Sequence, residues 1–263
     1  MSFDRSREVA AALYELASSS STNTELAARA DREGFADLTV MLTRYQSAGR
    51  GRLGRSWTAP PGASVATSVL LRPRLPDGSV PTPDRFGWLP VIAGVAMADA
   101  VARVLPAREV GFKWPNDVLV GGRKISGVLA EFLQSGTGVV VGAGLNTRMT
   151  ADELPVPTAT SLVVEGASVD DELEDQVVAA YLAGFRDRVV RYLAARADAE
   201  ASGIRAEART RCLTLGRPVR IELPGGEELL GTAVDLDADG RLILADRDGV
   251  ARSVAAGDVT HVR

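Results

Sequence analysis

The spacing of apolar residues predicts a β-rich middle flanked by helices. Apolar and β-branched runs bounded by Gly, Pro, Asn or Asp predict strands at residues 38–45, 64–71, 110–113, 117–120, 124–133 and 139–141. Helical spacing predicts helices at residues 7–17, 85–105 and 170–196, with a further one ending near 211. Thr22 and Glu25 have the T-x-x-E spacing of a capping box, so another helix is expected to start there.

The pattern changes after Cys212. Short strands separated by Gly- and Asp-containing turns are expected at residues 219–223, 229–236, 241–245, 250–254 and 259–262. Five strands at this spacing predict a small β-barrel, so we divide the chain into domains 1–212 and 213–263. The first domain lacks regular βαβ alternation, which favours an α+β fold with a mixed or antiparallel sheet over a Rossmann fold.

Composition excludes several classes of protein. With 46% hydrophobic and 24% charged residues, the chain is typical of a soluble globular protein. A single cysteine, Cys212, rules out an internal disulfide and any Cys-rich metal site, and a single histidine, His261, rules out a multi-His metal site. No signal peptide and no apolar run near the roughly 20 residues of a membrane span are present, so we expect a cytoplasmic protein that does not bind membranes.

Charge directs attention to one segment. The net charge is −4, which gives no overall attraction to nucleic acid. Of the 30 basic residues only Lys113 and Lys124 are lysine, and they lie close together in the chain. This clustering makes the region between them the first place to look for chemistry.

A glycine-arginine loop is the richest candidate site. Glycine permits close approach of the backbone to a ligand and arginine offers a bidentate fork, so the loop suits phosphate binding at Gly49-Arg50-Gly51-Arg52-Leu53-Gly54-Arg55. A solvated surface loop and an RGG-like nucleic-acid contact are the alternatives. The spacing is not that of a Walker A motif.

Two further segments carry polar groups at strand ends. Asn116 and Asp117 follow Pro115 and suit Mg²⁺ or a hydroxyl donor, although Pro-Asn-Asp is also common turn chemistry. In Gly142-Ala143-Gly144-Leu145-Asn146 a flat ring could lie against bare backbone, with Asn146 at an adenine edge; a glycine bulge is the alternative. Trp57 could stack on a base, but a single Trp is more often part of a core.

Together these motifs resemble the ordered motif series of the biotin protein ligases. The matching segments cover residues 20 to 147 and are Ser21-Thr22-Asn23, Tyr45 to Trp57, Lys113 to Asp117, Lys124 to Leu129 and Gly142 to Asn146. The resemblance implies a catalytic domain like that of class II synthetases, followed by an SH3-like barrel. It also implies ATP-dependent formation of biotinyl-5′-AMP and transfer of biotin to a lysine of a biotin carboxyl carrier domain of an acetyl-CoA or acyl-CoA carboxylase.

The resemblance also assigns roles to residues. The catalytic set it implies is Lys124, Arg50 and Arg52. For biotin it implies Ser21, Thr22, Asn23, Gln46, Arg50, Gly51, Arg52, Lys124 and Gly127. For ATP it implies Arg50, Arg52, Arg55, Trp57, Lys113, Asn116, Asp117 and Asn146, with Asp117 as the Mg²⁺ ligand.

Members of the family that also act as repressors carry an N-terminal DNA-binding domain. Only about twenty residues precede Ser21, too few for a three-helix DNA reader, so we expect a monofunctional ligase without DNA binding, as a monomer or weak homodimer. Two alternatives stay open: a lipoate or octanoate ligase of the same superfamily, and a non-catalytic nucleic-acid-binding module. The aromatic content of 5% counts against the second, because such modules stack bases on aromatic side chains.

Overall fold

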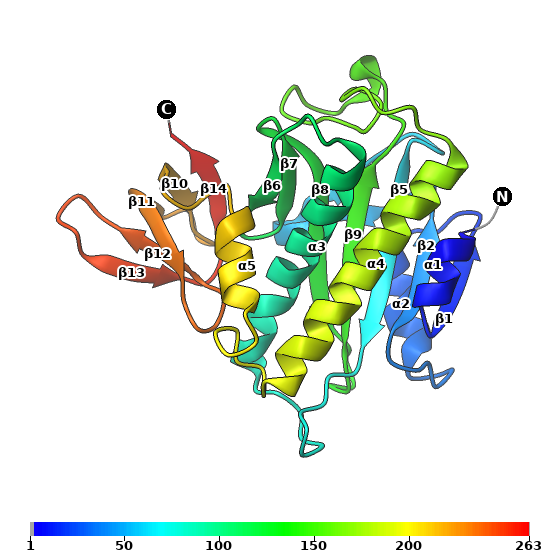
Figure 1. The fold of residues 1–263 in the computed structure, drawn as a ribbon, viewed down its shortest axis with the longest axis horizontal. Coiled ribbons are helices and arrows are strands. Elements are labelled where there is room, and N and C mark those ends of the chain that lie inside the picture. The colour runs from blue at the N-terminus through cyan, green and yellow to red at the C-terminus, as the bar shows by residue number, and fades with distance from the viewer. Residues whose placement is uncertain (1–2, 263) are drawn as a thin grey trace.

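The fold is built on a seven-stranded mixed sheet (Figure 1). A computed structural model describes residues 3–262. The strand order is β1 (Ala12–Leu16), β2 (Thr39–Thr43), β5 (Ser64–Leu71), β9 (Val139–Asn146), β8 (Arg123–Phe132), β7 (Asp117–Val120) and β6 (Val110–Lys113). Only β1 and β2 pair in parallel, and the other neighbours are antiparallel. This confirms the predicted α+β class.

Helices cover one face of this sheet. α3 (Trp88–Val104) packs on β6 to β9, α4 (Asp171–Ala194) packs on α3, and α1 (Asp4–Val9) packs on α4 (Figure 1). The 3₁₀ turn η2 (Pro83–Gly87) runs directly into α3. Together they form the helical segment Pro83–Val104, which is long and apolar enough to cross a membrane. However, 67% of its apolar window is buried inside this fold, as expected for a core helix.

α2 (Thr22–Ala30) lies on the opposite face of the sheet. Because side chains alternate along a strand, Val69 and Val141 face the core under α3 whereas Leu70 and Val140 face the small core under α2. The small core covers only part of that face. The uncovered part, where β5, β8 and β9 carry small residues, is available for a ligand site.

A second, antiparallel sheet follows α5 (Ile204–Arg211). Its strand order is β13 (Ala251–Val254), β12 (Leu242–Ala245), β11 (Glu228–Leu236), β10 (Pro218–Glu222) and β14 (Asp258–His261). The indole N–H groups of Trp88 and Trp114 donate to the carbonyls of Ala238 and Gly240 in its β11–β12 turn, at 2.8 and 2.9 Å. The two sheets are therefore joined by buried contacts, and the division at residue 212 stays a prediction.

Two expectations near the N-terminus are wrong. Residues 7–17 do not form one helix, because α1 ends at Val9 and the chain continues as the edge strand β1. The N-cap of α2 is Ser21, whose hydroxyl accepts from the Thr24 amide at 3.5 Å, and not Thr22. The hydroxyl of Thr22 is thus free of capping and reaches Gln46. Most of the other predicted strands and helices agree with the structure to within about two residues at each end. The exceptions are α3, which begins at Trp88 and not at the predicted residue 85, and the strand predicted at 139–141, which continues to Asn146 as β9 (Val139–Asn146).

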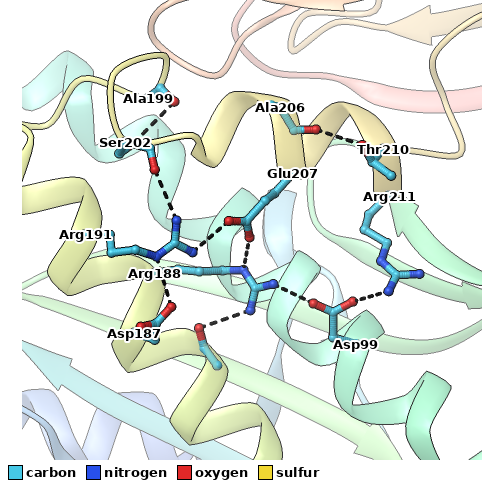
Figure 2. A network of polar contacts seen from close by, with 11 residues as sticks. Asp99, Asp187, Arg188, Arg191, Ala199, Ser202, Ala206, Glu207, Thr210 and Arg211 are labelled. Atoms are coloured by element: carbon cyan, nitrogen blue, oxygen red, sulfur yellow. Dashed lines mark hydrogen bonds and ion pairs between the residues drawn. The ribbon is translucent and has the colours of Figure 1, made fainter.

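An ion-pair network ties α5 to α3 and α4 (Figure 2). Arg188 of α4, whose side chain is 14% exposed, donates to Asp99 of α3 at 2.5 Å and to Glu207 of α5 at 2.8 Å. Arg211 pairs with the other oxygen of Asp99 at 2.7 Å, and Arg191 with Glu207 at 2.8 Å. Because α5 leads directly into the second sheet, this network also anchors that sheet.

We expect Arg188→Met to lower the free energy of unfolding by about 2 kcal/mol, because it removes the central cation of a largely buried network while Arg191 and Arg211 still pair with the acids. Urea denaturation would measure the loss. Arg196→Met is the matched control, because the Arg196–Asp77 pair is mostly exposed, with side chains 66% and 46% accessible. Equal effects of the two substitutions would contradict the structural role of the network.

The single histidine gives a pH prediction. Burial, followed by the positive charges of Lys113 and Arg217, lowers the pKa of His261 from its ordinary value of 6.5 to about 4. The unfolded chain therefore takes up a proton below pH 6.5 that the folded chain refuses until about pH 4. We expect stability to fall as the pH drops through this window, and less so in His261→Gln. In tag-free protein, NMR titration of the lone imidazole gives its pKa directly; a value near 6.5 would contradict the prediction.

Candidate active site

A cavity of about 120 Å³ opens on the face of the sheet that α2 partly covers. The predicted site residues that line it are Ser21, Thr22, Asn23, Gln46, Arg50, Gly51, Arg52, Arg55, Trp57, Asn116, Asp117, Lys124 and Gly127. They come from α2, the glycine-arginine loop and strands β7 and β8, which lie far apart in the sequence. The fold thus brings most of the predicted residues to one place.

Small residues on three adjacent strands form the floor of the cavity. Gly144 of β9 is the register partner of both Ala66 on β5 and Gly127 on β8. A Cβ atom on Gly144 would lie 2.6 Å from the Trp57 ring, and one on Gly142 would overlap the side-chain amide of Asn23. These glycines are required by close packing, because both have ordinary backbone conformations.

One end of the cavity is polar and uncharged. The Thr22 backbone amide donates to Gln46 Oε1 at 2.8 Å, and the Thr22 hydroxyl lies 3.1 Å from the same oxygen. Asn23 donates from Nδ2 to the Leu129 carbonyl at 3.1 Å and accepts at Oδ1 from Ser68, at 2.6 Å. Short hydroxyl and amide groups held in this way suit a neutral ligand with both donors and acceptors.

The other end carries the glycine-arginine loop. Its flanks pair as a short hairpin between β3 (Gly49–Arg50) and β4 (Ser56–Trp57), and its tip is the 3₁₀ turn η1 (Arg52–Gly54). Within the turn Leu53 has a φ of 55° and Gly54 a φ of 74°, so the tip uses left-handed backbone. This turn directs Arg50, Arg52 and Arg55 to the cavity wall.

Every cation on the wall has a partner within the protein. Arg50 pairs with Glu131 at 2.7 Å, Arg52 donates to the Asn116 side chain at 3.1 Å, and Lys124 pairs with Asp117 at 2.6 Å. Burial lowers the pKa of Arg52 from its usual value, and the charge of Asp117 opposes that shift. These cations line the cavity, so an anionic ligand there could form charge-assisted hydrogen bonds with them.

Asp258 on β14 completes the cationic end. Its carboxylate forms a bidentate ion pair with Arg55 and lines the cavity, and this pairing raises the pKa of Arg55 and lowers that of Asp258. The second sheet therefore contributes a side chain to the site. Sequence reasoning missed this residue because one aspartate in a strand-rich tail has no local signal.

Two of the predicted site residues, Asn146 and Lys113, do not line this cavity. Asn146 is 4% exposed and donates from Nδ2 to the Thr160 carbonyl at 2.9 Å, while its Oδ1 has no partner among the described residues. Lys113 is half-buried, and burial lowers the pKa of its ammonium against the opposing charges of Asp117 and Asp258. Both lie near the site, but the cavity wall does not include them.

The loop after β9 forms hydrogen bonds to the backbone of Lys124. The Lys124 amide donates to the Thr158 carbonyl at 2.7 Å, and the Thr160 amide donates to the Lys124 carbonyl at 2.8 Å. Glu165, whose side chain is 3% exposed, accepts from the Thr160 hydroxyl at 2.7 Å and pairs with Arg123. The sequence predicts residues 148–169 as a loop, and the structure adds that part of it is fixed against β8, with one 3₁₀ turn, η3 (Ala151–Glu153).

The site has few candidate ligands for a metal. Among residues 3–262, no group of three or more His, Cys, Asp or Glu side chains is placed to hold an ion. The carboxylates on the cavity wall are Asp117 and Asp258. This set fits Mg²⁺ only as an ion that shares its coordination with substrate phosphates and water, which is how Mg²⁺ commonly binds in phosphate-handling enzymes.

Comparisons with known proteins place the chain in a family. The model of the biotin/lipoate A/B protein ligase family matches residues 15–146, and that of the biotin protein ligase C terminal domain matches residues 214–262. The chain is 40% identical to the biotin–[acetyl-CoA-carboxylase] ligase of Mycobacterium tuberculosis, over 94% of this chain and 88% of that protein. It is 32% identical to the bifunctional ligase/repressor BirA of Escherichia coli, over 83% of this chain but only 65% of that protein.

Solved structures share the fold. Biotin protein ligase from Aquifex aeolicus in complex with biotin and ATP superposes with a TM-score of 0.72 at 23% identity, covering 95% of this chain and 98% of that one. Biotin protein ligase from Leishmania major in complex with biotin gives 0.60 at 25% identity, covering 93% and 98%. The chain therefore belongs to the biotin/lipoate A/B protein ligase family and, by its relatives and its C-terminal domain, to the biotin protein ligases.

Proposed function

We infer that this chain is an ATP-dependent biotin protein ligase, which forms biotinyl-5′-AMP and transfers the biotin to a lysine of a carrier protein. One observation carries the inference: a single cavity joins a neutral hydrogen-bonding end to an end with four cations, Arg50, Arg52, Arg55 and Lys124. Biotin has the same division, with an uncharged ureido ring at one end and a carboxylate at the other. The Mycobacterium tuberculosis relative described above is named as a ligase for biotin.

The neutral end would hold the ureido ring. A ureido group offers two N–H donors and one carbonyl acceptor, so its site needs both acceptors and donors without net charge. Ser21, Thr22, Asn23 and Gln46 supply hydroxyl and amide groups, and Gly127 and Gly144 leave room for the ring and its chain.

The cationic end would serve the first step. A carboxylate oxygen of biotin attacks the α-phosphorus of ATP, the bond from that phosphorus to the bridging oxygen breaks, and pyrophosphate leaves. Both reactants are anions, so preorganised cations lower the barrier chiefly by reducing their repulsion. Lys124 would exchange Asp117 for the carboxylate and α-phosphate, and Arg50, Arg52 and Arg55 would bind carboxylate and phosphate oxygens.

The second step uses the same positions. The neutral ε-amine of the acceptor lysine attacks the acyl carbon of biotinyl-5′-AMP, AMP leaves with the bonding electrons, and the surplus amine proton passes to water. Lys124 and Arg52 would then stabilise the charge that develops on the departing phosphate. Mg²⁺, when bound, would offset phosphate charge, and Asp117 with phosphate oxygens would hold it.

The nucleotide would extend along β9. Gly142, Gly144 and Asn146 alternate on the sheet face that carries the cavity, so a flat base could lie beyond Gly144. The unpartnered, buried Oδ1 of Asn146 suits an exocyclic amine such as that of adenine. Trp57 would stack near the adenylate, and Lys113 and Asn116 would support the phosphates.

The rival functions fit less well. A lipoate or octanoate ligase would need an apolar end where Thr22, Asn23 and Gln46 place polar groups. A nucleic-acid-binding module would need an open basic surface, whereas these cations line a cavity and are each paired within the protein. Mass spectrometry of the adenylate formed from ATP with biotin, lipoate or octanoate distinguishes the ligases.

We also propose that the acceptor is the carrier domain of a carboxylase and that the protein does not bind DNA sequence-specifically. We expect a cytoplasmic protein that is a monomer or a weak homodimer, with separate domains at residues 1–212 and 213–263. The Mycobacterium tuberculosis relative, which is named for acetyl-CoA carboxylase, supports the acceptor, and the net charge of −4 supports the absence of DNA binding. Binding to an operator-like duplex at physiological salt would contradict the proposed absence of DNA binding.

The function is tested by mixing the protein with ATP, Mg²⁺ and biotin and measuring biotin-dependent release of pyrophosphate together with bound biotinyl-5′-AMP. We expect the wild type to form the adenylate and Lys124→Ala to form it about 10³-fold more slowly, because the loss of a preorganised charge in a shielded site costs a few kcal/mol. Arg32→Ala, at a cation whose side chain is 68% exposed and remote from the cavity, is the control and should keep full activity. No adenylate from the wild type would refute the assignment.

A further inference from the structure

Glu131 on β8 joins the two ends of the cavity and has no role in the reaction described above. A single oxygen of its carboxylate, Oε2, accepts from Asn23 Nδ2 at 2.9 Å and from a terminal guanidinium nitrogen of Arg50 at 2.7 Å. Asn23 belongs to the neutral end and Arg50 to the cationic end. Glu131 itself is not among the residues that line the cavity.

The partners of Asn23 fix which way its amide faces. The Leu129 carbonyl and the Glu131 carboxylate can only accept, so both require the NH₂ group of Asn23 to point toward them. The opposite atom, Oδ1, must then face the fully buried hydroxyl of Ser68, at 2.6 Å. Gly142 makes this placement possible, because any side chain there would overlap the amide. An amide oxygen has two lone pairs, so Oδ1 can accept a second hydrogen bond in addition to the one from Ser68.

A carboxylate suits this arrangement because both of its oxygens can only accept hydrogen bonds. A glutamine at position 131 would have the same shape but would offer Asn23 a neutral, weaker acceptor, and in its reversed rotamer its donor group would face Asn23 and turn that amide over. A reversed Asn23 would present Oδ1 to the Leu129 carbonyl, and two acceptors in contact repel each other. Arg50 supplies the counter-charge that lets a carboxylate remain next to the neutral end of the site.

We propose that Glu131 is a positioning residue for biotin: its acceptor-only carboxylate holds the Asn23 amide in the orientation that presents Oδ1 to an N–H donor of the ureido ring. The proposal rests on the proposed function for the identity of the ligand. Part of the affinity for biotin then comes from a residue that does not line the cavity. It also predicts that Glu131 affects the binding of biotin and leaves the binding of ATP unchanged.

The test compares Glu131→Gln with wild type. We expect the Kd for biotin, from calorimetry without ATP, and the KM for biotin to rise about tenfold, because one hydrogen bond to a charged acceptor is lost. The KM for ATP and the kcat of adenylate formation should stay within twofold. Glu33→Gln is the matched control, because Glu33 pairs with Arg29 at 3.0 Å and has a similar exposure, 33% against 30%, but lies away from the cavity.

A double-mutant cycle separates the two partners of Glu131. In an Asn23→Ala background, Glu131→Gln should change the Kd for biotin by less than twofold, because the amide that it positions is absent. A tenfold effect that persists in this background, or an effect on the KM for ATP alone, would overturn the proposal in favour of a role through Arg50. An unchanged Kd for biotin in Glu131→Gln would also overturn it.

If Glu131→Gln fails to fold by its thermal melt, Glu131→Asp replaces it. Aspartate keeps an acceptor-only group but withdraws it by one methylene, so the Kd for biotin should still rise several-fold, and an unchanged Kd would overturn the proposal. Failure of the Glu131 proposal can be distinguished from failure of the proposed function. A wild type that binds biotin but forms no adenylate would refute the ligase assignment and leave the biotin measurements on Glu131 valid, whereas a wild type that binds no biotin would refute both.

Discussion

The site depends on bare backbone at alternate positions of one strand. Gly142 and Gly144 point to the same face of β9, and each is contacted by a different part of the chain, Asn23 from α2 and Trp57 from the arginine loop. A methyl group at either position would displace one of them. Both α2 and the glycine-arginine loop can therefore approach β9 only because Gly142 and Gly144 lack side chains. The cavity is the space between α2 and this loop.

A second constraint is electrostatic. The cavity gathers four cations in a protein whose net charge is −4, and acids from three separate strands balance three of them: Asp117 on β7, Glu131 on β8 and Asp258 on β14. Repulsion among unpaired cations would otherwise destabilise the folded chain. An anion that binds to these cations therefore competes with carboxylates that already pair with them, so its affinity depends on the geometry of the contacts more than on net attraction.

The sequence predicted elements well where local patterns determine them. β5, β6 and β7 agree with their predicted ranges because apolar runs end at Pro, Gly or Asn. The segment 7–17 failed because β1 exists only through parallel pairing with β2, a contact between residues almost thirty positions apart that local spacing does not encode. The motifs located most of the cavity wall but missed Asp258, Ser68 and Glu131. Asp258 lies on β14, far from the motifs in the sequence, and Ser68 and Glu131 form hydrogen bonds to side chains of the site from positions outside the cavity lining.

The motif Lys113-Trp114-Pro115-Asn116-Asp117 shows how the second sheet becomes part of the site. Asn116 and Asp117 face the cavity, whereas Trp114 is 1% exposed and donates to the Gly240 carbonyl of the β11–β12 turn. The tryptophan therefore fixes the second sheet against the strand end that carries the two polar residues. The same packing places β14 beside the glycine-arginine loop, where Asp258 pairs with Arg55. The Trp114 contact and the Asp258–Arg55 pair therefore link the C-terminal sheet both to the strand end that carries Asn116 and Asp117 and to the glycine-arginine loop.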